Sequence, residues 1–533
     1  MWRGLARLLL NRAVMEARLS AVPAPVIFLL VLLVSLLVSV PVFPATYVVD
    51  PAGDDANAGD AGTPWRTIKH AASSVAAGDT VIVHAGTYRE SVSVSRSGAA
   101  GSPISFVADP GAVLVSPNPS ASCEAFNILD GVSFITLQGI EATGGFDETI
   151  FVRPGAHDIS IEGCNLHHNR AGVIVSNAYN IVVQGCALHD NVRVGVRIAG
   201  SAHDVTVVDT DSFLNGNRNT CDSNVDGFAV TPLAQNITFQ RTRAYQNGGD
   251  GYDFKGDQVI ADGVESFENT CSGMKVWQGA TVQNSLIYGN ARGISTTSMT
   301  GGSAVTIRNC TIAQNDGVGV DLTASMTADT SYAVDLVNNI VAGDFKALQY
   351  VRSVSLSESY NILFRSTLYD PVIHKLRVAW YSDHKVNLGT WTSRTGQGQG
   401  TLAVDPLFVD PANADFHVLP TSAAVGRGAD LGGGMVNIGM FPFPAGPTNH
   451  APFADPGRNR VSYVGRLVRF NGSGSVDPDG DLMSYWWDLG DGSAPVAACA
   501  VSHAYAAPGT YTVTLTVSDG SLSGSNSARV VIR

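Results

Sequence analysis

The chain has 533 residues, of which 56 are glycine and only 15% are charged. This length exceeds one ordinary compact domain, and abundant glycine without helical heptads favours an all-β protein over a helix bundle. The formal net charge of −13 repels nucleic acid, so no nucleic-acid partner is expected, and an acidic polymer can bind only where a local cation offsets the charge.

The N-terminal residues predict export of the chain. Basic residues precede an apolar run from Val26 to Val40, which has the length of a signal-peptide core and is short for a bilayer span. Phe43 stands where a cleavage site prefers a small residue. Residues 1–45 are therefore predicted to be either a signal peptide or a retained membrane anchor, and both place the remaining chain in a secreted or cell-surface location.

A strand and a short helix are predicted next. Residues 46–50 read as the first strand, and Thr63 and Pro64 then predict a helix start, because proline is favoured at the first helical position. Apolar side chains within residues 65–75 fall on one face of this helix. Such a face can cover the open end of a stack of coils, so the helix is predicted to cap the domain that follows.

Seven asparagines recur at intervals of 21 to 32 residues, and most of them are followed by glycine and an alternating strand. A period in this range indicates a solenoid, in which each coil buries its apolar face only by stacking on its neighbours. We therefore predict a parallel β-helix over residues 46–445. The repeated residues are Asn169, Asn191, Asn215, Asn247, Asn269, Asn290 and Asn315.

The cysteines follow the same repeat. Cys164, Cys186 and Cys310 each stand five residues before a repeated asparagine, a place that holds threonine, valine or serine in the other repeats. This pattern predicts buried core thiols and argues against a metal or redox site. Cys221 and Cys271 could form a disulfide, but the sequence leaves this pairing open.

Charged residues gather at equivalent places of three consecutive repeats. Asp253 and Lys275 occupy the same place in adjacent coils, which stack about 4.8 Å apart, and their apolar neighbours predict that both side chains point outward. Arg197 shares this column. Asp226 and Asp250 each stand one residue before the glycine of their repeat. We therefore predict three carboxylates and one ammonium group on an exposed face.

This cluster suggests a reaction. Three carboxylates suit Ca²⁺, and a nearby cation lowers the pKa of a lysine and makes it a base. The cation could also hold a sugar carboxylate and stabilise the negative charge that develops on it. We therefore predict β-elimination of a uronic-acid polymer, in which Lys275 removes the C5 proton. Arg197 is a candidate for binding a substrate carboxylate.

The C-terminal residues 449–533 are predicted to form a separate module. They contain Trp-Asp-Leu-Gly-Asp-Gly at residues 487–492 and an alternating strand within residues 507–517. These segments closely resemble a polycystic-kidney-disease-type (PKD) domain, which implies an immunoglobulin-like β-sandwich. Such modules act as spacers or as contacts to polysaccharide or protein.

The charged repeats also resemble a known family. Asp226-Gly-Phe-Ala, Asp250-Gly-Tyr-Asp253 and Ser272-Gly-Met-Lys275 resemble the motifs of family 9 polysaccharide lyases, the pectate lyases with a right-handed parallel β-helix. This resemblance implies that Asp226, Asp250 and Asp253 bind Ca²⁺, that Lys275 is the Brønsted base and that the polymer is pectate. The family usually has two adjacent aspartates before Gly-Tyr-Asp, and here the first of them is Gly249.

Other interpretations stay open. The aspartates could instead cap turns, with Lys275 paired to Asp253, and the protein would then be a non-catalytic cell-surface carbohydrate-binding or adhesive β-helix. Alginate lyases and uronan epimerases share the fold, whereas the motifs of polygalacturonase-type hydrolases are not visible. His167, His168 and His189 could form a second site, although a solvated stack of turn residues is favoured. We expect a monomer whose partner is an acidic polysaccharide.

Overall fold

The computed structural model describes the chain from residue 44 onward, apart from several internal segments. The predicted signal peptide or anchor falls on residues 1–45 and lies outside the described residues except for its last two. Among the described residues, none of the helices combines the length and apolar character that a membrane crossing needs. The segments left out are 118–122, 223, 297–303, 323–331, 344–345, 351–353, 365–377, 381–383, 387–391, 394–395, 430–436, 441–451, 453, 458, 476, 478–482 and 521.

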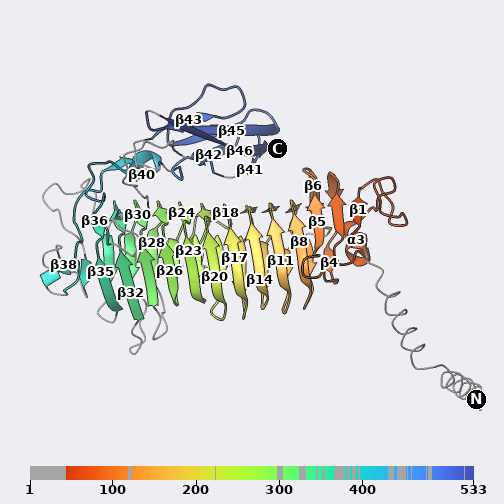
Figure 1. The fold of residues 1–533 in the computed structure, drawn as a ribbon, viewed down its shortest axis with the longest axis horizontal. Coiled ribbons are helices and arrows are strands. Elements are labelled where there is room, and N and C mark those ends of the chain that lie inside the picture. Colours follow the sequence, from red (N-terminus) through yellow and green to blue (C-terminus); the bar gives the residue numbers. More distant parts are fainter. Residues whose placement is uncertain are drawn as a thin grey trace, which may run out of the picture. The chain divides into compact units, whose positions relative to one another are not determined.

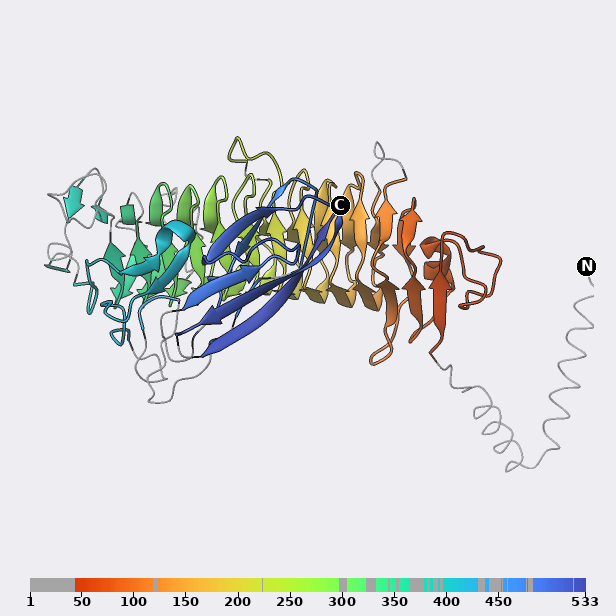
Figure 2. The same cartoon turned by 90° about the horizontal axis from the view of Figure 1, so that it is seen from above.

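The chain from Thr46 folds as a parallel β-helix with three sheets, called A, B and C here (Figures 1 and 2). Sheet A contains β1 (Thr46–Val49), β2 (Thr80–Val83), β5 (Ile104–Ala108), β8 (Ser133–Gln138), β11 (His157–Glu162), β14 (Tyr179–Gln184), β17 (His203–Val208), β20 (Gln235–Gln240), β23 (Asp257–Asp262), β26 (Ala280–Gln283), β29 (Ala304–Arg308), β32 (Tyr332–Val337) and β35 (Val354–Ser359).

Sheet B contains β4 (Val92–Val94), β7 (Phe126–Ile128), β10 (Glu148–Val152), β13 (Ala171–Ser176), β16 (Val196–Ala199), β19 (Phe228–Val230), β22 (Tyr252–Phe254), β25 (Ser272–Val276), β28 (Arg292–Thr296), β31 (Val318–Leu322), β34 (Lys346–Tyr350), β37 (Val378–Trp380) and β38 (His384–Val386). Sheet C contains β3 (Gly86–Tyr88), β6 (Ala112–Val115), β9 (Glu141–Thr143), β12 (Asn165–His167), β15 (Ala187–His189), β18 (Asp211–Phe213), β21 (Arg243–Tyr245), β24 (Glu265–Phe267), β27 (Leu286–Tyr288), β30 (Thr311–Ala313), β33 (Ile340–Ala342) and β36 (Ile362–Phe364).

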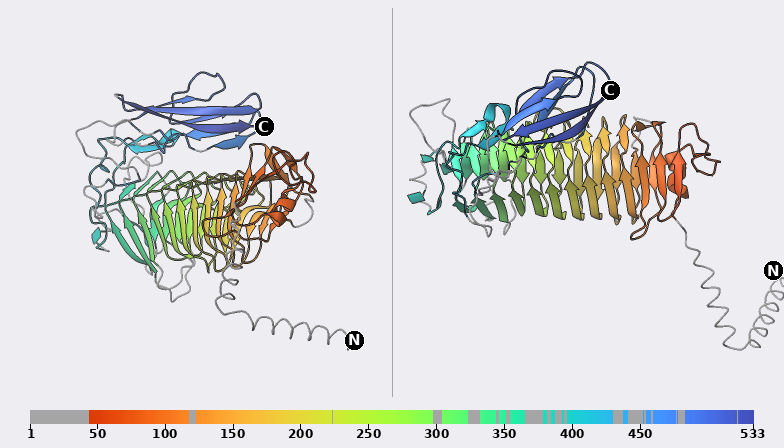
Figure 3. Two further views of the ribbon diagram at one scale, coloured as in Figure 1. Left: turned by 45° about the vertical axis from the view of Figure 1, so that its right-hand side comes forward. Right: turned by 45° about the horizontal axis from the view of Figure 1, so that its top comes forward.

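Each coil adds one strand to each sheet and pairs in parallel with the coils before and after it (Figure 3), and only β38, at the end of sheet B, pairs antiparallel, with β37, among the described strands of the three sheets. In sheet A, Val205 pairs with Ile237 and Val207 with Phe239, and all four side chains are buried. Successive residues of a strand point to opposite faces, so the alternation in the sequence places one apolar face inside the coil. The core therefore runs along the helix as a column of stacked apolar side chains.

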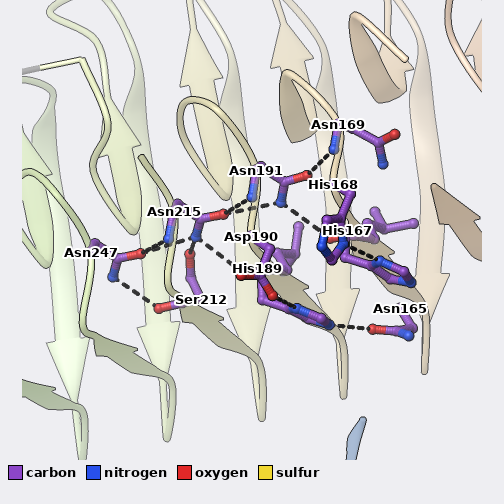
Figure 4. A network of polar contacts seen from close by, with 12 residues as sticks. Asn165, His167, His168, Asn169, His189, Asp190, Asn191, Ser212, Asn215 and Asn247 are labelled. Carbon is purple, nitrogen blue, oxygen red and sulfur yellow. Dashed lines mark hydrogen bonds and ion pairs between the residues drawn. The ribbon is translucent and has the colours of Figure 1, made fainter. Parts of the chain in front are cut away.

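The repeated asparagines form a buried ladder beside sheet C (Figure 4). The backbone N–H of Asn169 donates to Oδ1 of Asn191 at 3.1 Å, and Asn191 donates in the same way to Asn215 at 3.1 Å. The pattern recurs farther along, where Asn339 donates to Asn361 at 2.8 Å. Because each side chain satisfies a buried backbone group of its neighbour, the ladder fixes how the coils stack.

The capping helix α3 (Ile68–Ser74) begins later than the sequence predicts. Thr67 is its N-cap, with Oγ1 accepting the N–H of His70 at 3.1 Å, so the predicted start at Pro64 is wrong. The physical reason is Asp55, whose Oδ1 accepts the N–H of Thr67 at 2.9 Å and holds the chain extended there. Trp65 precedes the helix but is still buried, and its ring stacks on Tyr47 at 4.5 Å.

After the last coils the chain forms a short hairpin and then the C-terminal β-sandwich. Strands β39 (Phe408–Asp410) and β40 (Asp415–Val418) pair antiparallel on either side of the 3₁₀-helix η1 (Pro411–Asn413). The sandwich packs around the buried Trp487, Phe470 and Tyr505. Its sheets consist of β41 (Arg460–Ser462), β46 (Ser523–Ile532), β45 (Gly509–Ser518) and β43 (Ser484–Asp488), and of β42 (Leu467–Asn471) and β44 (Ala500–Ala504).

Candidate active site

Three consecutive strands of sheet B position the predicted cluster. Asp253 in β22 pairs in register with Ala229 in β19 and with Lys275 in β25. The neighbours of Asp253 on both sides, Tyr252 and Phe254, are fully buried in the core, so Asp253 points to the opposite face of the strand. The predicted alignment of Asp253 with Lys275 in adjacent coils is therefore confirmed.

Asp226 and Asp250 lie at the turns that precede β19 and β22. Oδ1 of Asp226 accepts the backbone N–H of Asp250 at 2.9 Å, and Oδ1 of Asp250 accepts the N–H of Ser272 at 2.7 Å. Each carboxylate thus uses one oxygen to bind the next coil. These bonds agree with the alternative interpretation, in which the aspartates cap turns between coils. They use one oxygen of Asp226 and one oxygen of Asp250.

The three carboxylates are buried, so the prediction of an exposed face is wrong for them. Asp226, Asp250 and Asp253 are only 3%, 2% and 0% exposed. Burial raises the pKa of Asp226 well above its usual range, and repulsion by Asp253 and Asp250 raises it further. Burial also raises the pKa of Asp250 to about 6, although Lys275 opposes this change. Burial therefore favours the neutral, protonated form of these two carboxyl groups, and a positive charge placed beside them would favour the ionised form.

Lys275 and Asp253 have different partners from those predicted. Nζ of Lys275 lies 3.8 Å from Oδ2 of Asp250. Asp253 instead pairs through Oδ2 with Nζ of Lys255, and its Oδ1 accepts the indole N–H of Trp277 at 2.6 Å. The ammonium groups of Lys255 and Lys275 lie 5.1 Å and 4.9 Å from the centroid of the Trp277 ring.

Lys255 and Trp277 are the residues that the sequence reasoning missed. Each stands two positions after a residue of the predicted outward column, Asp253 and Lys275 respectively. Both residues directly follow the strand that holds their partner, and extending the alternation of that strand by one residue would place them on the same face. Both side chains are half-buried, and both bind Asp253.

Gly249 lies where the resembling family has an aspartate, and the structure explains why no side chain fits there. A Cβ on Gly249 would lie 2.5 Å from the carbonyl oxygen of Asp222 and 2.7 Å from Oδ1 of Asp226. Asp222 belongs to the long loop that precedes β19, and a disulfide between Cys221 and Cys271 ties this loop to the turn before β25. The pairing left open by the sequence is thus formed, and the loop occupies the space of the absent carboxylate.

The donor set only partly fits a calcium ion. Carboxylate oxygens are the right ligands, and the raised pKa values of Asp226 and Asp250 come first from burial. However, both oxygens of Asp253 are bound by Lys255 and Trp277, and the described part of the chain contains no group of three or more acidic, histidine or cysteine side chains arranged to hold a metal. Asp253 fits as a ligand only after Lys255 leaves it.

Arg197 lies in β16 on the outward face of sheet B and is exposed. It pairs in register with Ala229, which pairs with Asp253. Two strand spacings, roughly 10 Å, therefore separate the backbones of Arg197 and Asp253. The structure thus keeps Arg197 in the same column but does not bring it into contact with the carboxylates.

His167 and His189 belong to strands of sheet C, His168 directly follows the first of these strands, and none of the three belongs to the cluster (Figure 4). His167 and His189 are each 2% exposed and stack with ring centroids 5.0 Å apart, so a solvated stack is wrong for these two. Burial lowers the pKa of His167 to about 4. The cysteines of the repeat behave as predicted, because Cys164, Cys186 and Cys310 are all buried thiols.

Comparisons with known proteins place this arrangement in a family. Residues 47–350 match the family described as "Pel9A-like, right handed beta helix region", and residues 449–533 match the PKD domain family. Two curated relatives match short segments of the chain. The uncharacterized protein YwoF of Bacillus subtilis (strain 168) is 47% identical over 58 residues, 11% of this chain and 12% of that protein. A microbial collagenase of Vibrio alginolyticus is 38% identical over 72 residues, 14% of this chain and 9% of that protein.

Solved structures similar to this chain include three lyases. Pectate lyase Pel9A is 20% identical, with 75% of this chain and 96% of that chain covered and a TM-score of 0.47. A rhamnogalacturonan lyase is 18% identical, with 69% and 92% covered and a TM-score of 0.44. An alginate lyase from Paenibacillus sp. str. FPU-7 is 14% identical, with 54% and 93% covered and a TM-score of 0.38.

Proposed function

Since the chain belongs to the Pel9A-like right-handed β-helix family and carries a C-terminal PKD domain, we propose that it is an exported polysaccharide lyase. Its substrate is a uronic-acid polymer, with pectate as the first candidate. The observation that carries the proposal is the position of Lys275, which lies in register with Asp253, 3.8 Å from Asp250 and partly open to solvent on the outward face of sheet B.

The reaction is a β-elimination with Lys275 as the base. Nζ of Lys275, in its neutral form, takes the C5 proton of a uronate. The electron pair of that C–H bond forms a double bond between C4 and C5, the bond from C4 to the glycosidic oxygen breaks, and that oxygen takes a proton from solvent. Asp250 lies beside Nζ and orients it, and a correctly placed base of this kind contributes about 10²–10⁴-fold in rate.

The carboxylates would hold Ca²⁺. Asp226 and Asp250 each retain an oxygen that is not used for the backbone bond to the next coil, and Asp253 joins them once Lys255 leaves it. When bound, Ca²⁺ supplies the positive charge that draws a sugar carboxylate to the cluster and stabilises the charge developing on it. Arg197, exposed on the same face, binds the carboxylate of a neighbouring sugar.

The N-terminal segment exports the protein, which acts as a monomer on an acidic polysaccharide outside the cell or at its surface. A second candidate function is a non-catalytic carbohydrate-binding or adhesive β-helix. The observation that favours it is the use of Asp226 and Asp250 to bind the backbone of the next coil, because carboxylates in such turns need no other role.

One experiment separates the two functions. The purified protein is incubated with polygalacturonate and, separately, with alginate, in Ca²⁺ and in chelator, and the ultraviolet absorbance of unsaturated uronide is followed. We expect Ca²⁺-dependent product that Lys275→Met reduces by about 100-fold or more. The matched control is Lys69→Met, which changes an exposed lysine of the distant helix α3. An intact fold that forms no product from either polymer would favour the binding function.

A further inference from the structure

One exposed tryptophan of the C-terminal sandwich has no part in the proposed elimination. The residues of β43 alternate between buried and exposed, so Tyr485 and Trp487 point into the core, and Trp486 between them points to the outer face. Trp486 is 42% exposed. Within the described part of the chain, its indole makes no hydrogen bond and stacks on no other ring. The indole N–H and the face of the ring are therefore both available to a ligand.

Hydroxyl groups surround this indole on the outer face of the sheet. β43 pairs antiparallel with β45, and β45 with β46 (Figure 1), so Trp486 lies opposite Thr516, and Thr516 lies opposite Ser525. The hydroxyls of Thr516 and Ser525 are 2.9 Å apart, as are those of Thr514 and Ser527 in the next row. Residues directly opposite each other in paired strands share a face, so these side chains lie on the same face as the indole. The row on the other side consists of Ser484, Ser518 and Ser523.

The outer face has almost no net charge. Residues 449–533 contain seven aspartates, six arginines and neither lysine nor glutamate, although the whole chain has a formal net charge of −13. β43, β45 and β46 are fully described, and their outward residues include two charged side chains, Asp488 and Arg529. Oδ1 of Asp488 accepts the backbone N–H of Gly490 at 2.9 Å, and Arg529 lies opposite Thr512. This face therefore favours an uncharged partner over the acidic polymer proposed as the substrate.

Sugars match this combination of groups. One face of a pyranose ring consists of C–H groups, which pack against an aromatic ring, and the hydroxyls at its edge exchange hydrogen bonds with protein hydroxyls. A single exposed indole is ordinary on a protein surface, but Trp486 lies among rows of hydroxyls that both donate and accept. A docking surface for a protein would need more apolar area than one indole.

We propose that the outer face of this sheet, centred on Trp486, binds an uncharged polysaccharide. The indole stacks on one sugar, and the hydroxyl rows bind the sugars on either side of it. The site belongs to the C-terminal module and goes beyond the proposed elimination, which uses Lys275 of the β-helix. Where the uncharged polysaccharide and an acidic polymer occur together, binding to the first raises the local concentration of the protein at the second.

Affinity electrophoresis of the full protein tests this site without relying on activity. Native gels contain hydroxyethylcellulose, a neutral galactan or, separately, polygalacturonate, each over a range of concentrations. We expect at least one uncharged polymer to retard the wild type, and Trp486→Ala to weaken this binding about tenfold, equivalent to about 1.4 kcal/mol. Trp486→Tyr keeps an aromatic face and should retain part of the binding. Leu467→Ala, the matched control, changes an exposed apolar residue of β42, in the other sheet, and should have no effect.

Circular dichroism checks the fold of each variant, and Thr516→Val, which removes one hydroxyl and keeps the shape, replaces Trp486→Ala if the latter fails to fold. Retardation by neither uncharged polymer would overturn the inference, as would equal retardation of the wild type and Trp486→Ala. Retardation by polygalacturonate alone would also overturn it. So would self-association of the wild type that Trp486→Ala abolishes in sedimentation, because the face would then bind a second copy. Retardation by an uncharged polymer, in a protein that forms no uronide, would support the inference and contradict the lyase.

Discussion

Acid should destabilise the β-helix through the buried imidazole of His167. Burial lowers its pKa from the ordinary 6.5 to about 4. The nearby carboxylate of Asp190 raises the pKa and favours the imidazolium, but burial has the larger effect and decides the direction. A base whose pKa is lowered by folding contributes stability that is fully present above about pH 6.5. This stability is lost as the pH falls from there through about 4.

The pKa of His167 is 6.5 in the unfolded chain and about 4 in the folded protein. At about 1.4 kcal/mol for each pH unit, this difference corresponds to about 3 kcal/mol of unfolding free energy, and most of it is lost by pH 4.5. His167→Phe removes this dependence and keeps the ring stack, because Phe213 already occupies the equivalent place two coils later. We would measure urea unfolding at pH 7.5 and pH 4.5 in the wild type, in His167→Phe and in the control His203→Tyr, which changes a more exposed histidine stacked on Tyr179. The reasoning is refuted if His167→Phe loses as much stability in acid as the wild type.

Three further predictions concern the coils around the cluster. Asn247→Leu should lower the free energy of unfolding by roughly 3 kcal/mol or more, because each buried partner left without a hydrogen bond costs about 1–3 kcal/mol; wild-type stability in urea would contradict the role of the ladder. Gly249→Asp should lower the unfolding midpoint without tightening Ca²⁺ binding, because its Cβ would lie 2.5 Å from the carbonyl of Asp222; a stable variant with tighter calorimetric binding would show that the loop gives way. Replacing Cys221 and Cys271 together by serine should lower the free energy of unfolding by about 4 kcal/mol, because the disulfide joins residues 50 positions apart. The loop should then become accessible to limited proteolysis. Unchanged cleavage would mean that other contacts hold the loop.

The β-helix could be predicted because its information is local and repeated. Each coil contributes an asparagine, a glycine and an alternating strand, and adding coils only repeats contacts between neighbours. The register of Asp253 with Lys275 followed from the same counting. The start of α3 could not be found in this way, because it depends on Asp55, which reaches the backbone of Thr67 from twelve residues earlier.

The partners within the cluster could not be predicted, because they depend on how side chains compete in space. Counting along the repeats placed Lys275 beside Asp253, but Lys255 and Trp277 already bind both oxygens of that carboxylate. Lys275 therefore lies nearest to Asp250 instead. Burial of the carboxylates could not be predicted for a related reason. The repeat pattern gives the position of each residue in its coil but not which neighbouring groups pack over its side chain.

The glycine at residue 249 and the presence of Lys255 have related effects on the charge of the cluster. The loop fixed by the Cys221–Cys271 disulfide brings the carbonyl of Asp222 against Gly249, which leaves no room for an acidic side chain. With glycine at residue 249, the cluster lacks the additional aspartate that the resembling family usually has. Together with the ammonium of Lys255 at Asp253, this reduces the negative charge that could attract a divalent cation. Because burial favours the neutral form of Asp226 and Asp250 and the chain's own lysines already pair with Asp253 and Asp250, this face can be balanced in charge by residues of the chain itself.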